Sequence, residues 1–229
     1  MSLPQSRFAS YFRTRMGPFA MVIVIAAGQA FIANAVGAIT GMFSWILPIV
    51  TLILLLISIF LYPEKHENLS KLARSLSIGV VVYLTVVNVL CMAWFVYDMF
   101  NPHTVTVAHE LLLAGGILWV MNVGIFALAY WELDGGGPEM RSVGTPSVFR
   151  GKTYPDFVFP QQTNNDERLS PKDWTPSFVD YLYLSSTSAT SFATSAPVPY
   201  TGMAKALVGS EALISFLTIG LIISRAIGL

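Results

Sequence analysis

The chain has 229 residues and no net formal charge, and 54% of its residues are hydrophobic while only 11% are charged. Soluble domains carry roughly a quarter charged residues, so this composition excludes an ordinary soluble domain and indicates a chain that lies mostly in lipid. A neutral chain gives no reason to expect a nucleic-acid partner, and the single cysteine, Cys91, excludes a disulfide within the chain.

Four apolar segments in the first part of the chain predict membrane-spanning helices, because a helix needs about 20 apolar residues to cross the hydrocarbon core. The predicted spans are residues 18–39, 43–62, 77–100 and 107–133. The first two share one long apolar stretch, which is divided at Thr40-Gly41. Residues 1–133 are therefore predicted to form a four-span helical bundle with a basic N-terminal arm.

Basic residues predict the orientation of these spans, because lysine and arginine mark the cytoplasmic side. They occur in the N-terminal arm, in the second loop and in the long loop of residues 134–176, whereas the first and third loops contain none. Four spans bring all three basic segments to one side. We therefore expect a multi-pass protein of the cell membrane, in contact with lipid, whose N-terminus and 134–176 loop are cytoplasmic.

Serine and threonine are concentrated after this loop, where residues 185–195 have the sequence SSTSATSFATS. A helix start precedes them, capped by Thr175-Pro176 or by Ser177, with Asp180 in its first turn. Irregular polar backbone is tolerated at membrane depth only where it is buried in protein or lines water, so the pattern predicts a re-entrant or interfacial short helix. A fifth span is predicted at residues 204–229.

The predicted fold is thus an all-α integral membrane protein with four transmembrane helices, a re-entrant or interfacial short helix and a fifth, C-terminal transmembrane helix. Residues 177–229 form its pore-loop-like part. Amides inside the spans are expected to face the bundle and to join helices by hydrogen bonds; they are Gln29, Asn34, Asn88 and Asn122.

The segment of residues 183–199 resembles the pore helix and filter of tetrameric potassium-type channels, with which it aligns without gaps. Thr190 falls on the pore-helix threonine of those channels, and Pro199 on the proline after the filter. The filter falls on Ser191, Phe192, Ala193, Thr194 and Ser195. Alanine and serine replace the two filter glycines, which argues against potassium selectivity of the usual kind because glycine lets the filter backbone turn its carbonyls inward.

This resemblance implies an ion-channel-like, pore-forming subunit that assembles as a homo-oligomer, as a tetramer if it follows the channels closely, and conducts monovalent ions. Thr187 joins Thr190 and the filter positions as a pore candidate, and residues 204–229 would be the inner helix. The charge bias places the pore loop on the cytoplasmic side, as in glutamate-receptor channels. Glu211 in the last span must be protonated, paired or wet, so it either lines a polar path or pairs with Lys205, Arg74 or Lys172.

The whole chain also resembles a group of small bacterial multi-spanning membrane proteins. Three elements carry this resemblance: Tyr-Trp-Glu-Leu-Asp-Gly-Gly-Gly-Pro at residues 130–138, Asp-Phe-Val-Phe-Pro at residues 156–160, and the segment of residues 180–192. The group has no assigned activity, so the resemblance implies a fold and no particular function.

Two other functions stay open from the sequence. The first is a non-conducting structural or accessory membrane subunit, in which the hydroxyl-rich helix only packs between helices. The second is a small transporter with a broken helix, although the chain shows no internal repeat. An enzyme is not expected, because no paired nucleophile and base is visible. No cofactor or metal is expected either, and His103, His109 and Glu110 are interpreted as interface residues.

Overall fold

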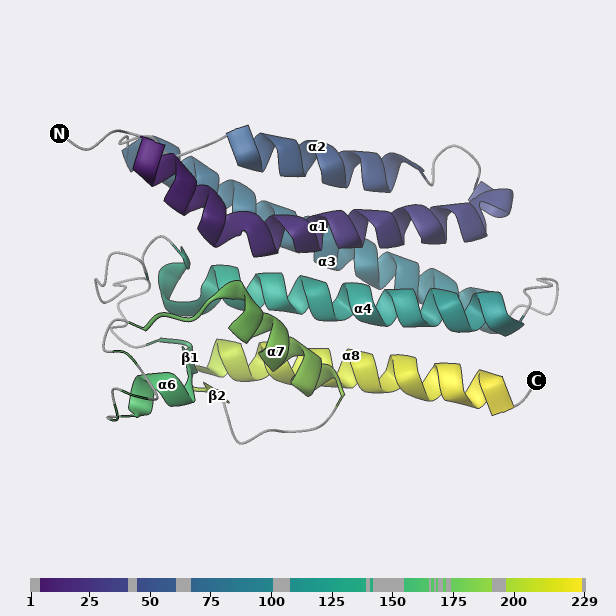
Figure 1. Cartoon of the computed structure of the whole chain (residues 1–229). Coiled ribbons are helices and arrows are strands. Elements are labelled where there is room, and N and C mark those ends of the chain that lie inside the picture. Colours follow the sequence, from purple (N-terminus) through teal and green to yellow (C-terminus); the bar gives the residue numbers. More distant parts are fainter. Residues whose placement is uncertain are drawn as a thin grey trace. The chain divides into compact units, whose positions relative to one another are not determined.

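The computed structural model describes residues 5–40, 45–60, 67–100, 108–138, 141, 155–164, 166, 168, 171, 174–190 and 197–227, and these are mostly helical. The elements, in chain order, are α1 (Gln5–Thr40), α2 (Ile46–Phe60), α3 (Glu67–Phe100), α4 (Ala108–Leu133), η2 (Asp134–Gly136), β1 (Phe157–Val158), α6 (Pro160–Thr163), α7 (Phe178–Ala189), β2 (Val198–Pro199) and α8 (Gly202–Ile227) (Figure 1). The all-α class predicted from the sequence is confirmed.

Within the described residues, four helices are long and apolar enough to cross a membrane. Their apolar parts are Thr14–Asn34, Leu72–Phe100, Leu112–Gly136 and Gly202–Ser224. The remaining apolar helix, α2, has 15 residues, which corresponds to about 22 Å and is shorter than a typical hydrocarbon core of about 30 Å. Helices α1 and α3 begin well before the predicted spans, because the helix continues into polar turns that an apolar run does not reveal.

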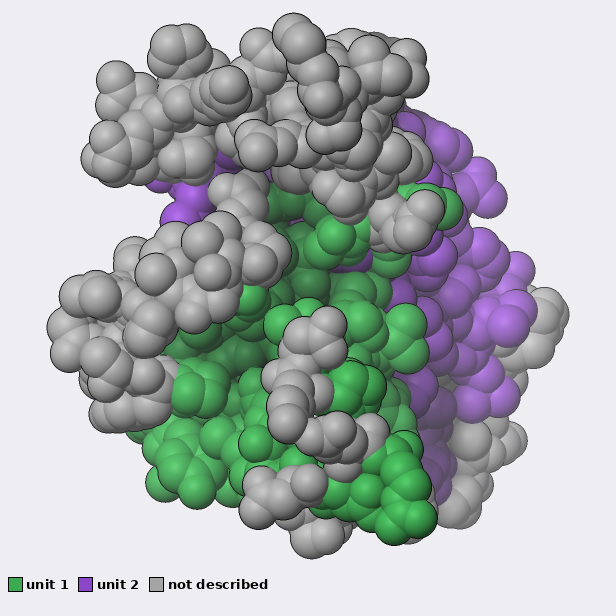
Figure 2. All heavy atoms as spheres, turned by 60° about the vertical axis from the view of Figure 1, so that its left-hand side comes forward, with its two compact units in different colours: residues 1–17, 126–214 green, residues 18–125, 215–229 purple. Residues whose placement is uncertain are grey.

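Contacts divide the chain into two compact units, each made of two separate stretches. Unit 1 comprises Met1–Gly17 and Phe126–Ile214, and unit 2 comprises Pro18–Ile125 and Ser215–Leu229 (green and purple in Figure 2). Helices α1, α4 and α8 therefore each contribute residues to both units. The segments of residues 1–133, 134–176 and 177–229 follow chain order and remain a prediction.

In unit 2, two glycines allow close contact between α1 and α4. A Cβ atom at Gly28 would lie 2.6 Å from the sulfur of Met121, and one at Gly124 would lie 2.5 Å from the sulfur of Met21. Each glycine thus accepts a methionine of the other helix, which is the use that membrane helices make of small residues at their interfaces.

Buried amides also join the helices of unit 2. Asn88 Nδ2 donates to Asn122 Oδ1 at 3.1 Å, and Asn122 Nδ2 donates to Ser215 Oγ at 3.0 Å. The Thr51 hydroxyl donates to Gln29 Oε1 at 2.7 Å. The predicted role is confirmed for these three amides, but it is wrong for Asn34, whose side chain is exposed in the chain.

Candidate functional site: a buried carboxylate and hydroxyl cluster around α7

The cluster begins at the turn after α4, in unit 1. Gly135, Gly136 and Gly137 have φ values of +55°, +85° and +99°, which glycine adopts far more readily than residues with a side chain. The Gly137 N–H donates to the Asp134 carbonyl at 2.9 Å. This turn ends α4 and leaves the Asp134 side chain fully buried, with 0% of its surface exposed.

The Asp134 carboxylate joins the end of α4 to β1 and to α7. Its Oδ1 accepts the backbone N–H groups of Asp156, at 2.8 Å, and Phe157, at 3.1 Å. Its Oδ2 accepts the hydroxyl of Tyr181 on α7 at 2.5 Å. Three donors from two separate segments thus satisfy one buried carboxylate, as a buried charge requires.

Arg141 closes the same end of α4. Its guanidinium donates to the carbonyls of Asp134 and Trp131, at 2.5 and 2.8 Å, and it lies 5.1 Å from the ring centre of Tyr181. A cation at a helix C-terminus offsets the partial negative charge of the free carbonyls. A second arginine, Arg15, lies 5.3 Å from the centre of the Trp131 ring and 3.7 Å from the Glu132 carboxylate.

Asp156 fixes the start of α8 beside β1. Its Oδ1 accepts the Thr201 hydroxyl at 2.6 Å, and its carbonyl accepts the Tyr200 N–H at 2.8 Å. The Thr201 hydroxyl oxygen accepts the Ala204 N–H at 3.2 Å, in the first turn of α8. The strands β1 and β2 pair antiparallel next to these contacts, so the return from α7 into α8 is held at the Asp134 end of α4.

A second buried carboxylate, Glu211 on α8, meets α4 and α7. The Tyr130 hydroxyl donates to Glu211 Oε2 at 2.5 Å, and the Ser185 hydroxyl donates to Oε1. Glu211 has 0% of its surface exposed. Both carboxylate oxygens thus accept hydroxyl groups, whereas Lys205 on the same helix is exposed, so the suggested pairing of Glu211 with Lys205 is wrong. Lys172 lies outside the described residues.

Aromatic rings fill the space between the two carboxylates. The Phe157 ring lies 5.0 Å from Tyr130 and 6.4 Å from Tyr181, measured between ring centres. Phe159 lies 5.2 Å from Tyr181. Phe157 and Phe159 are 1% and 3% exposed, so the Asp-Phe-Val-Phe-Pro element packs into unit 1 and keeps the polar groups away from solvent.

Helix α7 has a buried face and an outer face. Phe178, Tyr181, Leu184, Ser185 and Ala189 are buried. The outer face carries exposed Val179 and Tyr183 and partly exposed Thr187 and Thr190. At the helix start, the backbone N–H and hydroxyl of Ser177 both donate to the Asp180 carboxylate at 2.7 Å, so of the two predicted caps Ser177 is the one that the structure has.

The hydroxyl hydrogens along α7 are mostly bonded to its own backbone. Ser186 and Thr187 donate to the Tyr183 carbonyl, Ser188 donates to that of Leu184, and Thr190 donates to that of Ser186. The hydroxyl oxygens of Thr187 and Thr190, both partly exposed, have lone pairs that can accept hydrogen bonds or face a cation.

The predicted site residues fall into three groups. Thr187 and Thr190 lie on the outer, partly exposed side of α7. Glu211 lies in the buried cluster. The filter candidates Ser191, Phe192, Ala193, Thr194 and Ser195 lie outside the described residues.

Sequence reasoning missed the partners that build the cluster. They are Tyr130 and Asp134, four residues apart on the α4 side, and Tyr181 and Ser185, four residues apart on α7. Residues at this spacing share one face of a helix. The three elements that carry the bacterial resemblance contain all four of these residues together with Asp156. The resemblance was therefore the feature of the sequence from which the cluster could have been predicted.

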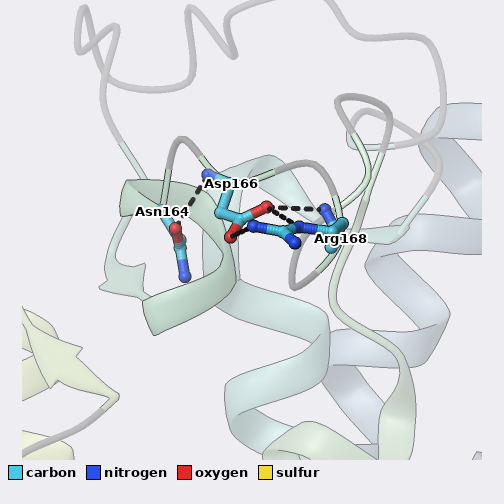
Figure 3. A network of polar contacts seen from close by, with 3 residues as sticks. All are labelled: Asn164, Asp166 and Arg168. Carbon is cyan, nitrogen blue, oxygen red and sulfur yellow. Dashed lines mark hydrogen bonds and ion pairs between the residues drawn. The ribbon is translucent and has the colours of Figure 1, made fainter.

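The 160–168 region carries a separate exposed turn (Figure 3). Asn164 Oδ1 accepts the Asp166 N–H at 2.9 Å, and the guanidinium and backbone N–H of Arg168 donate to the Asp166 carboxylate at 3.0 to 3.3 Å. The Arg168 side chain, and then its backbone N–H, lower the pKa of Asp166 below its ordinary value. Among the residues that the structure describes, no group of three or more His, Cys, Asp or Glu gathers to hold a metal.

Comparison of the chain with protein-family models, with curated proteins and with solved structures finds no match.

Proposed function

We propose that this chain is an integral membrane protein that forms a homo-oligomeric, ion-channel-like pore, in which the re-entrant segment of residues 177–201 and α8 line the path. The observation that carries the proposal is that the beginning and the end of this segment are anchored at the same end of α4. Tyr181 bonds to Asp134, and Thr201 bonds to Asp156, whose backbone N–H bonds to Asp134. A segment that leaves and returns on one side is what a pore loop requires.

The length of α7 supports this arrangement. Its 12 residues correspond to about 18 Å, too short to cross the hydrocarbon core but long enough to enter it. A helix end at such a depth requires cover by protein or water, because lipid cannot satisfy free N–H and C=O groups.

The charge distribution supports five crossings, with α2 included. Without a crossing by α2, the basic second loop would lie on the side opposite to the basic N-terminal arm, against the usual bias of lysine and arginine. Local thinning of the bilayer accommodates a helix of 15 residues at a modest energetic cost.

The outer face of α7 supports a path between copies of the chain. Thr187 and Thr190 are partly exposed on the side away from the buried cluster, and only 17% of the apolar part of α8 is buried within the chain. Neighbouring copies would cover α8 and enclose the hydroxyl oxygens, which suit monovalent ions. Fourfold symmetry follows from the channel resemblance alone.

Ion flux through liposomes that contain the purified full-length chain tests this proposal. We expect flux of monovalent ions that falls several-fold in Thr187→Val and Thr190→Val, which replace a hydroxyl by a methyl group of similar size. Thr163→Val is the matched control, because Thr163 is an exposed hydroxyl on α6. Sealed liposomes that hold the folded protein and pass none of potassium, sodium or chloride would refute the pore.

The second candidate is a non-conducting structural or accessory membrane subunit. It is favoured by the hydroxyl hydrogens of α7, which bond to carbonyls of the same helix and are thus satisfied without water. For this function we expect no flux, and a loss of oligomer in size-exclusion chromatography when Tyr183, exposed on α7, is replaced by a charged residue.

A further inference from the structure

We propose that Glu211 is a positioning residue that determines ion selectivity: acting through Ser185, it fixes the rotation and depth of α7 and so decides which side chains of α7 face the path. This inference rests on the proposed pore and names the group that sets its geometry. Glu211 itself is fully buried and is placed outside the path.

Two hydrogen bonds, one helical turn apart, hold the buried face of α7. Tyr181 donates to Asp134 after α4, and Ser185 donates to Glu211 on α8. All four side chains are 0% exposed. Because the two acceptors belong to different elements, the two bonds together fix both the position of α7 along its axis and its rotation about that axis.

Apolar packing alone would hold α7 less specifically. Dispersion contacts are non-directional, so a helix with an apolar face can shift or rotate at little cost, whereas a buried hydrogen bond is lost when its geometry changes. Single buried polar groups are known to specify register between helices at a cost in stability. Tyr130 holds the other oxygen of Glu211 at 2.5 Å, so the carboxylate cannot simply follow Ser185 if α7 moves.

The consequence reaches the opposite face of the helix. Successive residues of an α-helix are about 100° apart, so a rotation of α7 by one residue would turn Thr187 and Thr190 away from their positions and would expose Ala189, which is 1% exposed. Loss of the Ser185 hydrogen bond therefore changes which side chains of α7 face the path, although none of the side chains on its outer face is itself replaced.

Cysteine modification measures this rotation directly. The only native cysteine, Cys91, is first replaced by serine, and Ala189→Cys is then introduced as the reporter. Its rate of reaction with a charged, membrane-impermeant thiosulfonate is compared in three backgrounds: unchanged, Ser185→Ala and Ser188→Ala. Ser188 is the matched control, because it lies on the same helix and donates to the carbonyl of Leu184.

We expect the reporter to react about tenfold faster with Ser185→Ala, the factor that corresponds to about 1.4 kcal/mol for one lost buried hydrogen bond, and at an unchanged rate with Ser188→Ala. Reversal potentials in planar bilayers should show a changed ratio of potassium to sodium permeability for Ser185→Ala and for Glu211→Leu. Glu211→Gln should retain the original ratio, because an amide of the same shape can still bond both hydroxyls.

The outcomes separate the two proposals. A wild-type chain that passes no ion overturns the pore itself. If the wild type conducts, but Ser185→Ala and Ser188→Ala have the same permeability ratio and the same reporter rate, the proposed role of Glu211 is overturned. The proposed pore is not affected by that result. A permeability ratio in Glu211→Gln that matches that of Glu211→Leu also overturns it, because the charge and not the hydrogen bonds would then be responsible.

Discussion

Replacement of Tyr181 by phenylalanine removes one hydroxyl from the centre of unit 1 and leaves the ring in place. The Tyr181 hydroxyl donates to Asp134 Oδ2 at 2.5 Å, and both side chains are 0% exposed. A hydrogen bond to a charged group contributes about 1.5–3 kcal/mol, and a buried acceptor that loses its partner also loses the compensation for its desolvation. The backbone donors of Asp156 and Phe157 remain on Oδ1, so we expect a loss of about 2 kcal/mol in the free energy of unfolding.

The measurement is reversible unfolding of the purified chain in mixed detergent micelles, followed by circular dichroism. Tyr183→Phe is the matched control, because Tyr183 lies on the same helix and is 53% exposed; its change should stay within about 0.5 kcal/mol of zero. Equal free energies of unfolding for the two variants would refute the reasoning, since the Tyr181 hydroxyl would then contribute no more than an exposed one.

Three further predictions concern the turn after α4, the buried amides and the exposed loop. Gly137→Ala places a side chain at a φ of +99°, and the free energy of unfolding should fall by at least about 1–2 kcal/mol in the same assay. The control is Gly79→Ala, in α3 with open space around it, which should leave this free energy unchanged or raise it. Asn122→Leu removes two buried hydrogen bonds between helices and should cost about 1–2 kcal/mol; an unchanged stability would mean that its partners find other bonds. Arg168→Ala should raise the pKa of Asp166 back toward its ordinary value, as followed by NMR titration. The pKa of Asp166 is lowered in the folded chain. Its hydrogen bonds therefore stabilise the turn at pH values above the ordinary pKa of aspartate, and this stabilisation is lost as the pH falls through the lowered pKa. An identical titration of Asp166 in the wild type and in Arg168→Ala would contradict this.

The helices of this chain could be located from composition and apolar runs. The predicted segments at residues 107–133 and 204–229 correspond to α4 (Ala108–Leu133) and α8 (Gly202–Ile227) within a few residues. Apolar length is a local property, and the glycine run after α4 and the Ser177–Asp180 pair mark helix ends through their own backbone chemistry. The other three predicted spans differ more: α1 and α3 begin 13 and 10 residues earlier than predicted, and α2 (Ile46–Phe60) is shorter than the apolar run from which it was predicted.

The cluster around α7 was decided by tertiary structure. Glu211 can be recognised from the sequence, because it is an acid within an apolar helix. Its partners Tyr130 and Ser185 lie 81 and 26 residues away along the chain. A tyrosine or serine near a helix end does not stand out in this way. The sequence left two interpretations open for Glu211, lining a polar path or pairing with a cation, since a carboxylate in lipid must be protonated, paired or wet. Folding supplied two hydroxyls instead.

The sequence by itself thus determined the local properties of this protein: which segments are helical and apolar, where they end, and where hydroxyl groups are concentrated. Only the tertiary structure decided that the glycine turn, the Asp-Phe-Val-Phe-Pro element and α7 meet around two buried carboxylates. The physical reason is that helix formation depends on neighbours a few residues away, whereas the hydrogen-bond partners of a buried charge are whichever groups the folded chain brings to it.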